Sequence, residues 1–207
     1  MGLRERKKEQ TRRSIEDAAF RLFEERGYQA TTVADIAAAA DIAPRTFFAY
    51  FPSKEAVVFG DFEENFAGLA TRLRERPAGE NTFEGLRAWI GELIDSDHAA
   101  DEHDTVRRQL VCDNESLASH ERHIMGYFER LIAESVAVDL GDAPTDLQPR
   151  LVAAAATAAL MAMQPDKDAK DHKKGRPDAE SMAQLDDAFA FLRGGIAALQ
   201  ERRAATS

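Results

Sequence analysis

Apolar positions recur at helical spacing along most of the chain. Between residues 14 and 26 they follow one another at steps of three and four, which indicates one face of an amphipathic helix. Alternation typical of a β-strand does not persist for more than a few residues. The pattern therefore predicts an all-α fold. Further helices are expected over residues 54–76, 82–97, 103–113, 116–139, 146–163 and 179–202.

The segment between residues 27 and 53 carries a series of helix start and stop signals. Gly27 stands where a first helix ends, and Thr32 with Asp35 three residues later is typical of a capped helix start. Pro44 suits the first turn of another helix because its missing N–H has no partner there. We therefore expect a helix over 32–40, a tight turn and a short helix over 44–51, which is helix-turn-helix spacing.

Residues 11–57 resemble the DNA-binding domain of TetR-type (tetracycline-repressor-like) transcriptional regulators. The resemblance rests on the segments AFRLF at 19–23, GY at 27–28, TTV at 31–33, IA at 36–37, TFF at 46–48 and YFPSKE at 50–55. One departure is Asp41, where the family usually has glycine in the turn. Aspartate tolerates a left-handed backbone better than most residues, so we expect little effect.

The family resemblance implies how the chain is divided. Residues 1–54 would form a three-helix DNA-binding domain, and residues 55–207 a helical domain that binds an effector and dimerises. Two segments are candidate dimer elements: the small-residue run at 151–160, and the apolar face of the last helix. That face comprises Leu185, Ala188, Phe189, Leu192, Ile196 and Leu199. Periodicity alone leaves open whether these faces complete a monomer core, and the resemblance favours the dimer.

The resemblance also implies which residues meet DNA. At the major groove it places Pro44, Arg45, Thr46 and Phe48, and at phosphates it places Thr32, Tyr50 and Lys54. The chemistry suits these positions, because an arginine can donate two hydrogen bonds to guanine and tyrosine and lysine are phosphate donors. The alternative is that the aromatic residues of this short helix pack in the core. We expect burial for Phe47 and Phe51, but not for Tyr50.

Charge is unevenly distributed along the chain. The net charge is −10, yet residues 1–55 hold 10 basic and 9 acidic residues, and residues 56–207 carry −11. The first 13 residues sum to +4, so the acidic average does not exclude a nucleic-acid partner. The basic side chains able to reach a neighbouring groove or backbone are Arg4, Arg6, Lys7, Lys8, Arg12 and Arg13. The alternative interpretation is a solvated terminus.

Two segments, 58–62 and 76–80, are similar to a branch of the family that is associated with acyl-coenzyme A thioesters or related lipophilic effectors. Such an effector would need an apolar pocket between central helices. The candidate lining residues are Phe62, Phe66, Trp89, Leu93, Leu110, Phe128, Leu131 and Met161, with Arg107 for anionic groups. For each of them, ordinary core packing or a solvated charge is the alternative.

Catalytic and metal sites find little support. His120 and His123 share a helical face but lack a nearby third ligand, so a solvated surface is favoured. There is no glycine-rich phosphate loop and no nucleophile elbow, so we expect neither an enzyme nor a cofactor. The single cysteine, Cys112, cannot form an internal disulfide and is expected to be buried. The charged segment 166–177 is expected to be an exposed loop.

These observations together favour a cytoplasmic, ligand-responsive regulator of transcription. The longest uncharged run, 151–165, is shorter than the roughly 20 apolar residues of a membrane span, so no membrane partner is expected. The expected partners are an operator duplex, a second copy of the chain and a small-molecule effector. The simplest mechanism is a repressor released from a pseudo-palindromic operator, with the helix from Lys54 as the lever. The alternatives are an effector-independent regulator or activator, and a helical ligand carrier that does not bind DNA.

Overall fold

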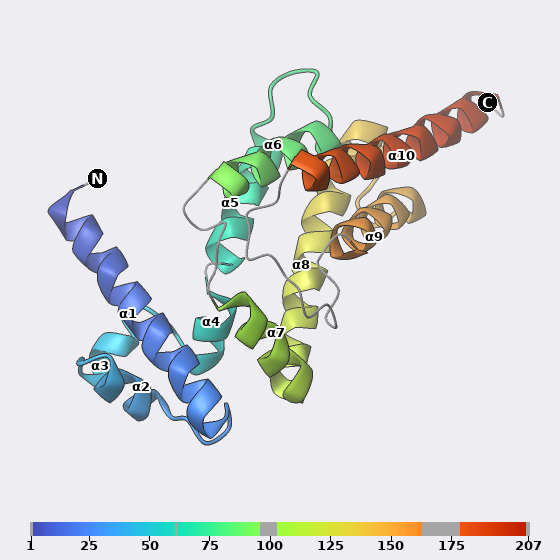
Figure 1. The fold of residues 1–207 in the computed structure, drawn as a ribbon. Helices are drawn as coiled ribbons and strands as arrows, with labels where there is room; N and C mark the ends of the chain where they lie inside the picture. The colour runs from blue at the N-terminus through green and yellow to red at the C-terminus, as the bar shows by residue number, and fades with distance from the viewer. Residues whose placement is uncertain (1, 61, 96–102, 163–178, 206–207) are drawn as a thin grey trace. The chain divides into compact units, whose positions relative to one another are not determined.

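The computed structural model describes residues 2–60, 62–95, 103–162 and 179–205, and every regular element in those ranges is a helix (Figure 1). The all-α prediction is confirmed. The segment predicted as an exposed loop, 166–177, lies outside the described residues.

The chain divides by spatial packing into two compact units. The first unit comprises residues 1–62 and 102–122, and the second comprises residues 63–101 and 123–207. The helices of the first unit are α1 (Leu3–Arg26), α2 (Val33–Ala39), α3 (Pro44–Phe47), α4 (Lys54–Phe59) and α7 (Asp104–Asp113). The second unit holds α6 (Thr82–Asp95), α9 (Leu147–Ala162), α10 (Ala179–Ala204) and nearly all of α5 (Phe62–Arg74). Helix α8 (Glu115–Leu140) begins in the first unit and ends in the second. The predicted domain boundary at residue 54 stays a prediction.

Helix α1 supplies much of the core of the first unit, where it packs against α2, α4 and α7. The predicted apolar face is buried, with Ile15 fully enclosed and Leu22 nearly so. The predicted cap of α2 is also confirmed: Asp35 N donates to Thr32 Oγ1 at 3.1 Å, and Thr32 N donates to Asp35 Oδ2 at 2.9 Å. The box therefore gives local acceptors to two backbone N–H groups, those of Thr32 and Asp35, at a helix start that lacks earlier carbonyls to accept them.

Two predicted helices are shorter in the structure. Helix α3 ends at Phe47, and a turn over residues 48–50 replaces its predicted last part. Ala49 N donates to Thr46 O at 3.1 Å and Tyr50 N to Phe47 O at 2.9 Å, so the chain continues in the tighter i→i+3 pattern. The helix predicted over 54–76 is interrupted: α4 ends at Phe59, and Gly60 adopts a positive φ of 55°. A glycine in that conformation ends a helix without steric cost. The prediction of one continuous lever helix from Lys54 is therefore wrong.

The core of the second unit includes the apolar face of the last helix. Helix α10 packs on α6 and α9, and Leu185, Phe189 and Leu192 are buried there. The ring of Phe189 lies 5.3 Å from that of Phe83 in α6. These three residues of the candidate dimer face complete the core of a single chain instead, which is the alternative that periodicity left open.

Candidate nucleic-acid interface and ligand site

The short helix α3 and the turn after it separate inward-facing from outward-facing aromatic side chains. Phe47 and Phe51 are buried, as predicted, and their ring centroids lie 5.9 Å apart. Phe48 points outward and is 56% exposed. Pro44 and Arg45 are also exposed, and Thr46 and Tyr50 are half-buried. All five residues of this segment that the resemblance assigns to DNA therefore present surface to solvent.

The turn before α3 fixes where this outer side lies. Asp41 has a φ of 55°, so the left-handed conformation expected at this position is confirmed. Ile42 N donates to Ala37 O at 2.9 Å, which ties the turn to α2. Pro44 then occupies the first turn of α3 with Ala43 as the N-cap residue. The orientation of α3 is thus set by backbone bonds to its immediate neighbour.

Thr32, at the start of α2, is exposed but already bonded. Its hydroxyl donates to Asp35 Oδ2 at 2.6 Å as well as accepting from the Asp35 backbone. Hydrogen bonds from the Thr32 side chain and backbone hold the pKa of Asp35 below its usual range. A phosphate contact by the Thr32 hydroxyl would have to redirect its proton away from this carboxylate.

Lys54 has an internal role that the sequence did not reveal. Its Nζ donates to Tyr28 O at 3.0 Å and to Thr31 O at 3.2 Å, and it lies 4.2 Å from the centroid of the Tyr28 ring. An ammonium has three N–H donors, so two are committed to the turn between α1 and α2. Lys54 therefore anchors the start of α4 to that turn, and one donor remains for a phosphate.

The neighbouring residue Glu55 reinforces the same connection. Tyr28 donates its hydroxyl proton to Glu55 Oε1 at 2.6 Å. Burial and this hydrogen bond to the carboxylate raise the pKa of Tyr28. For Glu55, burial acts to raise the pKa, but the hydrogen bonds, with that from Tyr28 foremost, lower it on balance. The end of α1 and the start of α4 are thus joined by a charge-assisted bond.

In the second unit, three predicted ligand residues meet in one aromatic cluster. The ring centroid of Phe66 lies 5.2 Å from that of Phe128 and 6.4 Å from that of Trp89. Tyr127, which the sequence reasoning did not single out, joins them at 6.4 Å from Phe66. Phe66 and Phe128 are buried, whereas Trp89 is half-buried. We call these four residues the aromatic cluster.

The other predicted ligand residues lie elsewhere or are not described. Leu93 is half-buried in α6, and Met161 is exposed on α9. Leu110 is buried in α7 of the first unit, where Arg107 donates through Nε to Val58 O and lies over the Phe20 ring. The structure does not describe the side chain of Phe62. The anion-binding role predicted for Arg107 stays a prediction.

A cavity of about 720 Å³ lies in the second unit beside the carboxyl end of α5. Its apolar lining comes from Ala70, Leu73, Leu131 and Val138, and Arg74 contributes a cationic side chain. Among the predicted ligand residues whose side chains the structure describes, Leu131 alone lines this cavity. This volume lies within the range of small-molecule sites.

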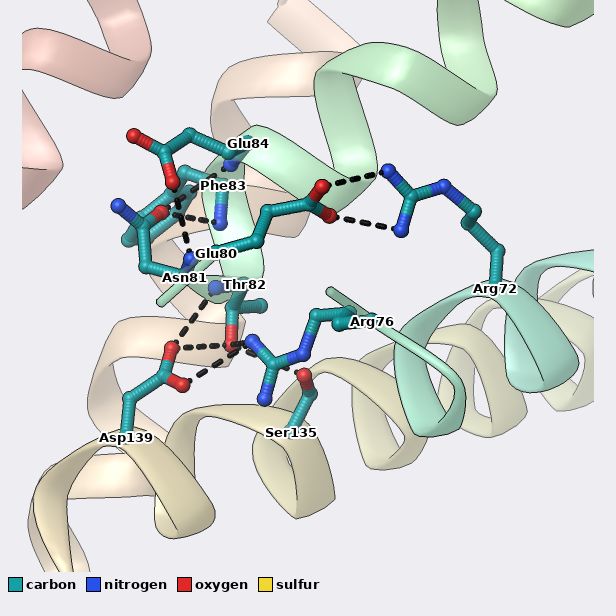
Figure 2. Close-up of polar contacts among 9 residues, drawn as sticks. All are labelled: Arg72, Arg76, Glu80, Asn81, Thr82, Phe83, Glu84, Ser135 and Asp139. Atoms are coloured by element: carbon teal, nitrogen blue, oxygen red, sulfur yellow. Dashed lines mark hydrogen bonds and ion pairs between the residues drawn. The ribbon is translucent and has the colours of Figure 1, made fainter. Parts of the chain in front are cut away.

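Part of the cavity wall is a polar corner that joins the end of α5, the start of α6 and α8 (Figure 2). Asp139 Oδ2 accepts from Thr82 N at 2.8 Å and from Thr82 Oγ1 at 2.6 Å, while Arg76 lies 3.0 Å from the other carboxylate oxygen. Arg72 forms a two-pronged ion pair with Glu80, at 2.7 and 2.9 Å. No pattern in the sequence indicates this corner, because Asp139 stands 57 residues from Thr82.

The described residues also bear on the metal, thiol and membrane interpretations. In the ranges that the structure covers, no three His, Cys, Asp or Glu side chains are grouped to hold a metal ion. The ring of His120 lies 4.8 Å from that of Phe59, and His123 is exposed. Cys112 is exposed, so its predicted burial is wrong: α7 turns this side of its last turn outward. Among the described helices, none has the length and apolar character needed to cross a membrane.

Comparisons with known proteins agree with this geometry. The family of bacterial regulatory proteins called the tetR family matches residues 15–59, and the MftR C-terminal domain matches residues 80–197. The regulator TcmR of Streptomyces glaucescens is 34% identical over 163 residues, covering 74% of this chain and 71% of its own. MftR of Mycobacterium tuberculosis is 30% identical over 148 residues, covering 72% and 75%.

Solved structures share the fold. NalD, the secondary repressor of the MexAB-OprM multidrug efflux pump in Pseudomonas aeruginosa, superimposes with a TM-score of 0.58 at 20% identity, covering 88% of this chain and 96% of its own. GusR of Salmonella enterica gives a TM-score of 0.52 at 21% identity, covering 89% and 94%. At these identities the likeness concerns the fold alone.

Proposed function

Since the chain belongs to the TetR family of transcriptional regulators, we propose that it represses transcription from a pseudo-palindromic operator and is released by a small lipophilic effector. Its relatives are named as transcriptional regulators, and the chain is a DNA-binding regulator rather than an enzyme. We assign DNA binding to residues 1–54, and effector binding and dimerisation to residues 55–207. The operator DNA implies that it acts in the cytoplasm.

The outward-facing side of α3 is the observation that carries the DNA-binding proposal. Arg45 and Phe48 extend into solvent because Phe47 and Phe51 hold the opposite side in the core. An exposed guanidinium can donate two parallel bonds to guanine O6 and N7, and Phe48 offers an apolar contact to a thymine methyl. Pro44 and Thr46 complete the surface proposed to face the major groove, and Thr32, Tyr50 and Lys54 are proposed phosphate donors.

Substitution of Arg45 tests this assignment directly. Arg45→Ala is expected to weaken discrimination at one base pair by about 1–3 kcal/mol, because one bidentate contact to a base is lost. Duplexes selected from a random pool by the wild-type protein supply the probe, and the ratio of Kd values for selected and scrambled duplexes is the readout. Arg21→Ala removes the same charge from the exposed surface of α1 and serves as the matched control. An unchanged ratio for Arg45→Ala would remove this residue from base recognition.

A second copy of the chain is the partner proposed for the outer face of α9 and α10. Val152, Ala153 and Ala156 face inward, whereas Leu147 and Leu151 are exposed on the opposite side of α9. On α10, Phe191 is 81% exposed. Large apolar side chains on two neighbouring helices are unfavourable in water and typical of a protein interface. The dimer face proposed for α10 is therefore the side bearing Phe191, not the side bearing Leu185.

Sedimentation equilibrium tests this dimer. Phe191→Asp is expected to sediment with the mass of one chain where the wild type sediments as two, because a charge would be buried without a partner. Val138→Asp is the matched control, since Val138 is similarly exposed but belongs to α8. Two monomeric variants would point to general destabilisation, and two dimeric variants would exclude Phe191 from the interface.

The effector is proposed to be an acyl-coenzyme A thioester or a related lipophilic molecule. The aromatic cluster and the apolar side of the cavity offer contacts to an acyl chain, and Arg74 offers a charge for an anionic head group. Binding there would favour a conformer with misplaced recognition helices and lower the operator affinity. Acyl-coenzyme A thioesters should raise the Kd for the selected duplex, and free coenzyme A should not. If no thioester releases the duplex, the protein acts without this class of effector.

A further inference from the structure

We propose that the cavity of the second unit selects ligands that carry an N–H donor beside an acid group, and that Glu134 is the residue that accepts from this donor. The inference rests on the proposed effector site and narrows the chemistry of its ligand. One wall of the cavity is a single face of α8, on which Leu131, Glu134, Ser135 and Val138 follow one another at helical spacing. The opposite wall is the end of α5 and the segment after it.

Five charged side chains line the cavity, and three of them form ion pairs in the polar corner. Arg76 pairs with Asp139 at 3.0 Å, and Glu80 pairs with Arg72 at 2.7 Å (Figure 2). Each pair joins one positive and one negative side chain. The polar corner therefore contributes no net charge to the cavity.

The other two charged lining residues, Arg74 of α5 and Glu134 of α8, have opposite signs. In the part of the chain that the structure describes, no hydrogen bond or ion pair engages either of them, and they do not pair with each other. Both are exposed, whereas Ala70, Leu73 and Leu131 are each 5% exposed and form the apolar floor of the cavity. The cavity therefore combines an apolar floor with one cationic and one anionic side chain that are open to a ligand.

A ligand whose apolar part covers this floor brings its polar part to both charges. An acid group on the ligand accepts hydrogen bonds from the Arg74 guanidinium. The same acid group is repelled by the Glu134 carboxylate, because an ionised carboxylate can only accept. An amide or ammonium N–H beside the acid group removes this conflict, since it donates a charge-assisted hydrogen bond to Glu134.

This requirement separates two kinds of lipophilic acid. A free fatty acid has an anionic group but no N–H donor, so Glu134 disfavours it. An acyl-coenzyme A thioester has amide N–H groups between its acyl chain and its phosphates, and an N-acylated amino acid has one beside its carboxylate. Glu134 is therefore the specificity-determining residue among acyl compounds, whereas Arg74 attracts all of those that are anionic.

The test compares three probes with the same acyl chain: decanoate, N-decanoylglycine and N-decanoylsarcosine. The last two differ only in the amide nitrogen, which carries a hydrogen in the glycine compound and a methyl group in the sarcosine compound. Isothermal titration calorimetry at pH 7, below micelle-forming concentrations, measures the Kd of each probe for the full chain without DNA. The wild type is expected to bind N-decanoylglycine about tenfold more tightly than N-decanoylsarcosine, because the latter cannot donate to an ionised acceptor.

Glu134→Ala isolates the contribution of the carboxylate. In this variant the ratio of those two Kd values should fall to about one. Decanoate should bind about threefold more tightly than to the wild type, because a like charge is removed. A gain in affinity is not expected from a variant that only loses stability. Glu129→Ala is the matched control, since Glu129 belongs to the same helix but does not line the cavity, and it should keep the wild-type ratio.

Several results would overturn the inference. A ratio near one in the wild type, or an unchanged ratio in Glu134→Ala, would show that Glu134 does not accept from the ligand. An equal fall of the ratio in Glu129→Ala would indicate a diffuse effect of net charge. If the wild type binds none of the three probes, the inference fails, whereas binding of the selected duplex, measured separately, leaves the proposed regulator intact. Conversely, the expected ratio in a protein that binds no duplex would refute the proposed repressor and support the ligand chemistry.

Discussion

The recognition region and the second unit are stabilised by contacts of different range. Around α2 and α3, the bonds join near neighbours, as in the pair Thr32–Asp35 and the turn between Ala37 and Ile42. In the second unit, Thr82 bonds to a residue 57 positions away, and Arg87 pairs with Asp186 across 99 positions. The recognition surface therefore depends on a short piece of chain, whereas the cavity wall depends on helices that must first come together. Substitutions in each region can test this difference.

The largest effect is expected in the core beneath the recognition surface. Phe47 is fully buried, so Phe47→Ala should lower the free energy of unfolding by about 3–5 kcal/mol. Phe48 follows it directly but is exposed, so Phe48→Ala should cost less than about 1 kcal/mol while weakening binding to the selected duplex. Chemical denaturation of both variants makes the comparison. Equal losses would mean that α3 does not have the inner and outer sides described here.

An intermediate effect is expected at the polar corner of the second unit. Asp139→Ala should cost about 2–4 kcal/mol, because it leaves Arg76 without its carboxylate and Thr82 without its acceptor. The Arg76 side chain is only 9% exposed, so water compensates little.

The matched control is Asp186→Ala, which breaks a pair between α6 and α10 whose side chains are about half exposed. Exposed pairs contribute little, so this loss should stay below about 1 kcal/mol. Denaturant unfolding of the two variants decides the matter. Similar losses would contradict the view that the corner is the more tightly integrated contact.

The range of contacts also explains what could be predicted from the sequence. The buried face of α1, the capping pair Thr32–Asp35 and the left-handed Asp41 depend on neighbours in the chain, and all were predictable. The polar corner was not, because nothing near Thr82 indicates that Asp139 accepts from it. Helical period likewise showed that α10 has an apolar face, but not whether that face meets this chain or another.

Lys54 shows a second reason why the sequence predicts only part of the site. A family motif can assign a residue its binding partner, but it does not state which bonds that residue makes within the protein. The resemblance assigns Lys54 to phosphate, and that role stays a prediction. The structure adds two bonds from its ammonium to carbonyls of the α1–α2 turn. These bonds depend on where Tyr28 and Thr31 lie in space, which no spacing in the motif states. Lys54→Ala should therefore lower the free energy of unfolding of the first unit as well as weaken DNA binding, because both bonds to the α1–α2 turn are lost.

A smaller effect than at the polar corner is expected for the hydroxyl of Tyr28, which joins the end of α1 to α4. Tyr28→Phe should lower the free energy of unfolding by about 1–2 kcal/mol at neutral pH, because Glu55 loses a charge-assisted donor. Tyr50→Phe is the matched control, since the Tyr50 hydroxyl makes no hydrogen bond within the ranges that the structure covers. It should leave the free energy of unfolding nearly unchanged.

The pH dependence of this difference identifies the bond itself. The pKa of Glu55 is lowered in the folded protein, so its ionised form stabilises the fold above the ordinary value of 4.5, and that stabilisation is lost as pH falls through the lowered value. The gap between wild type and Tyr28→Phe should therefore be full at pH 7 and shrink below about pH 4.5. Tyr28 has a raised pKa, so its own contribution persists below its ordinary value of 10 and declines above it. Denaturant unfolding at pH 3, 5 and 7 measures the gap on the acid side. A gap of constant size would show that the Tyr28 hydroxyl stabilises the first unit independently of the charge on Glu55.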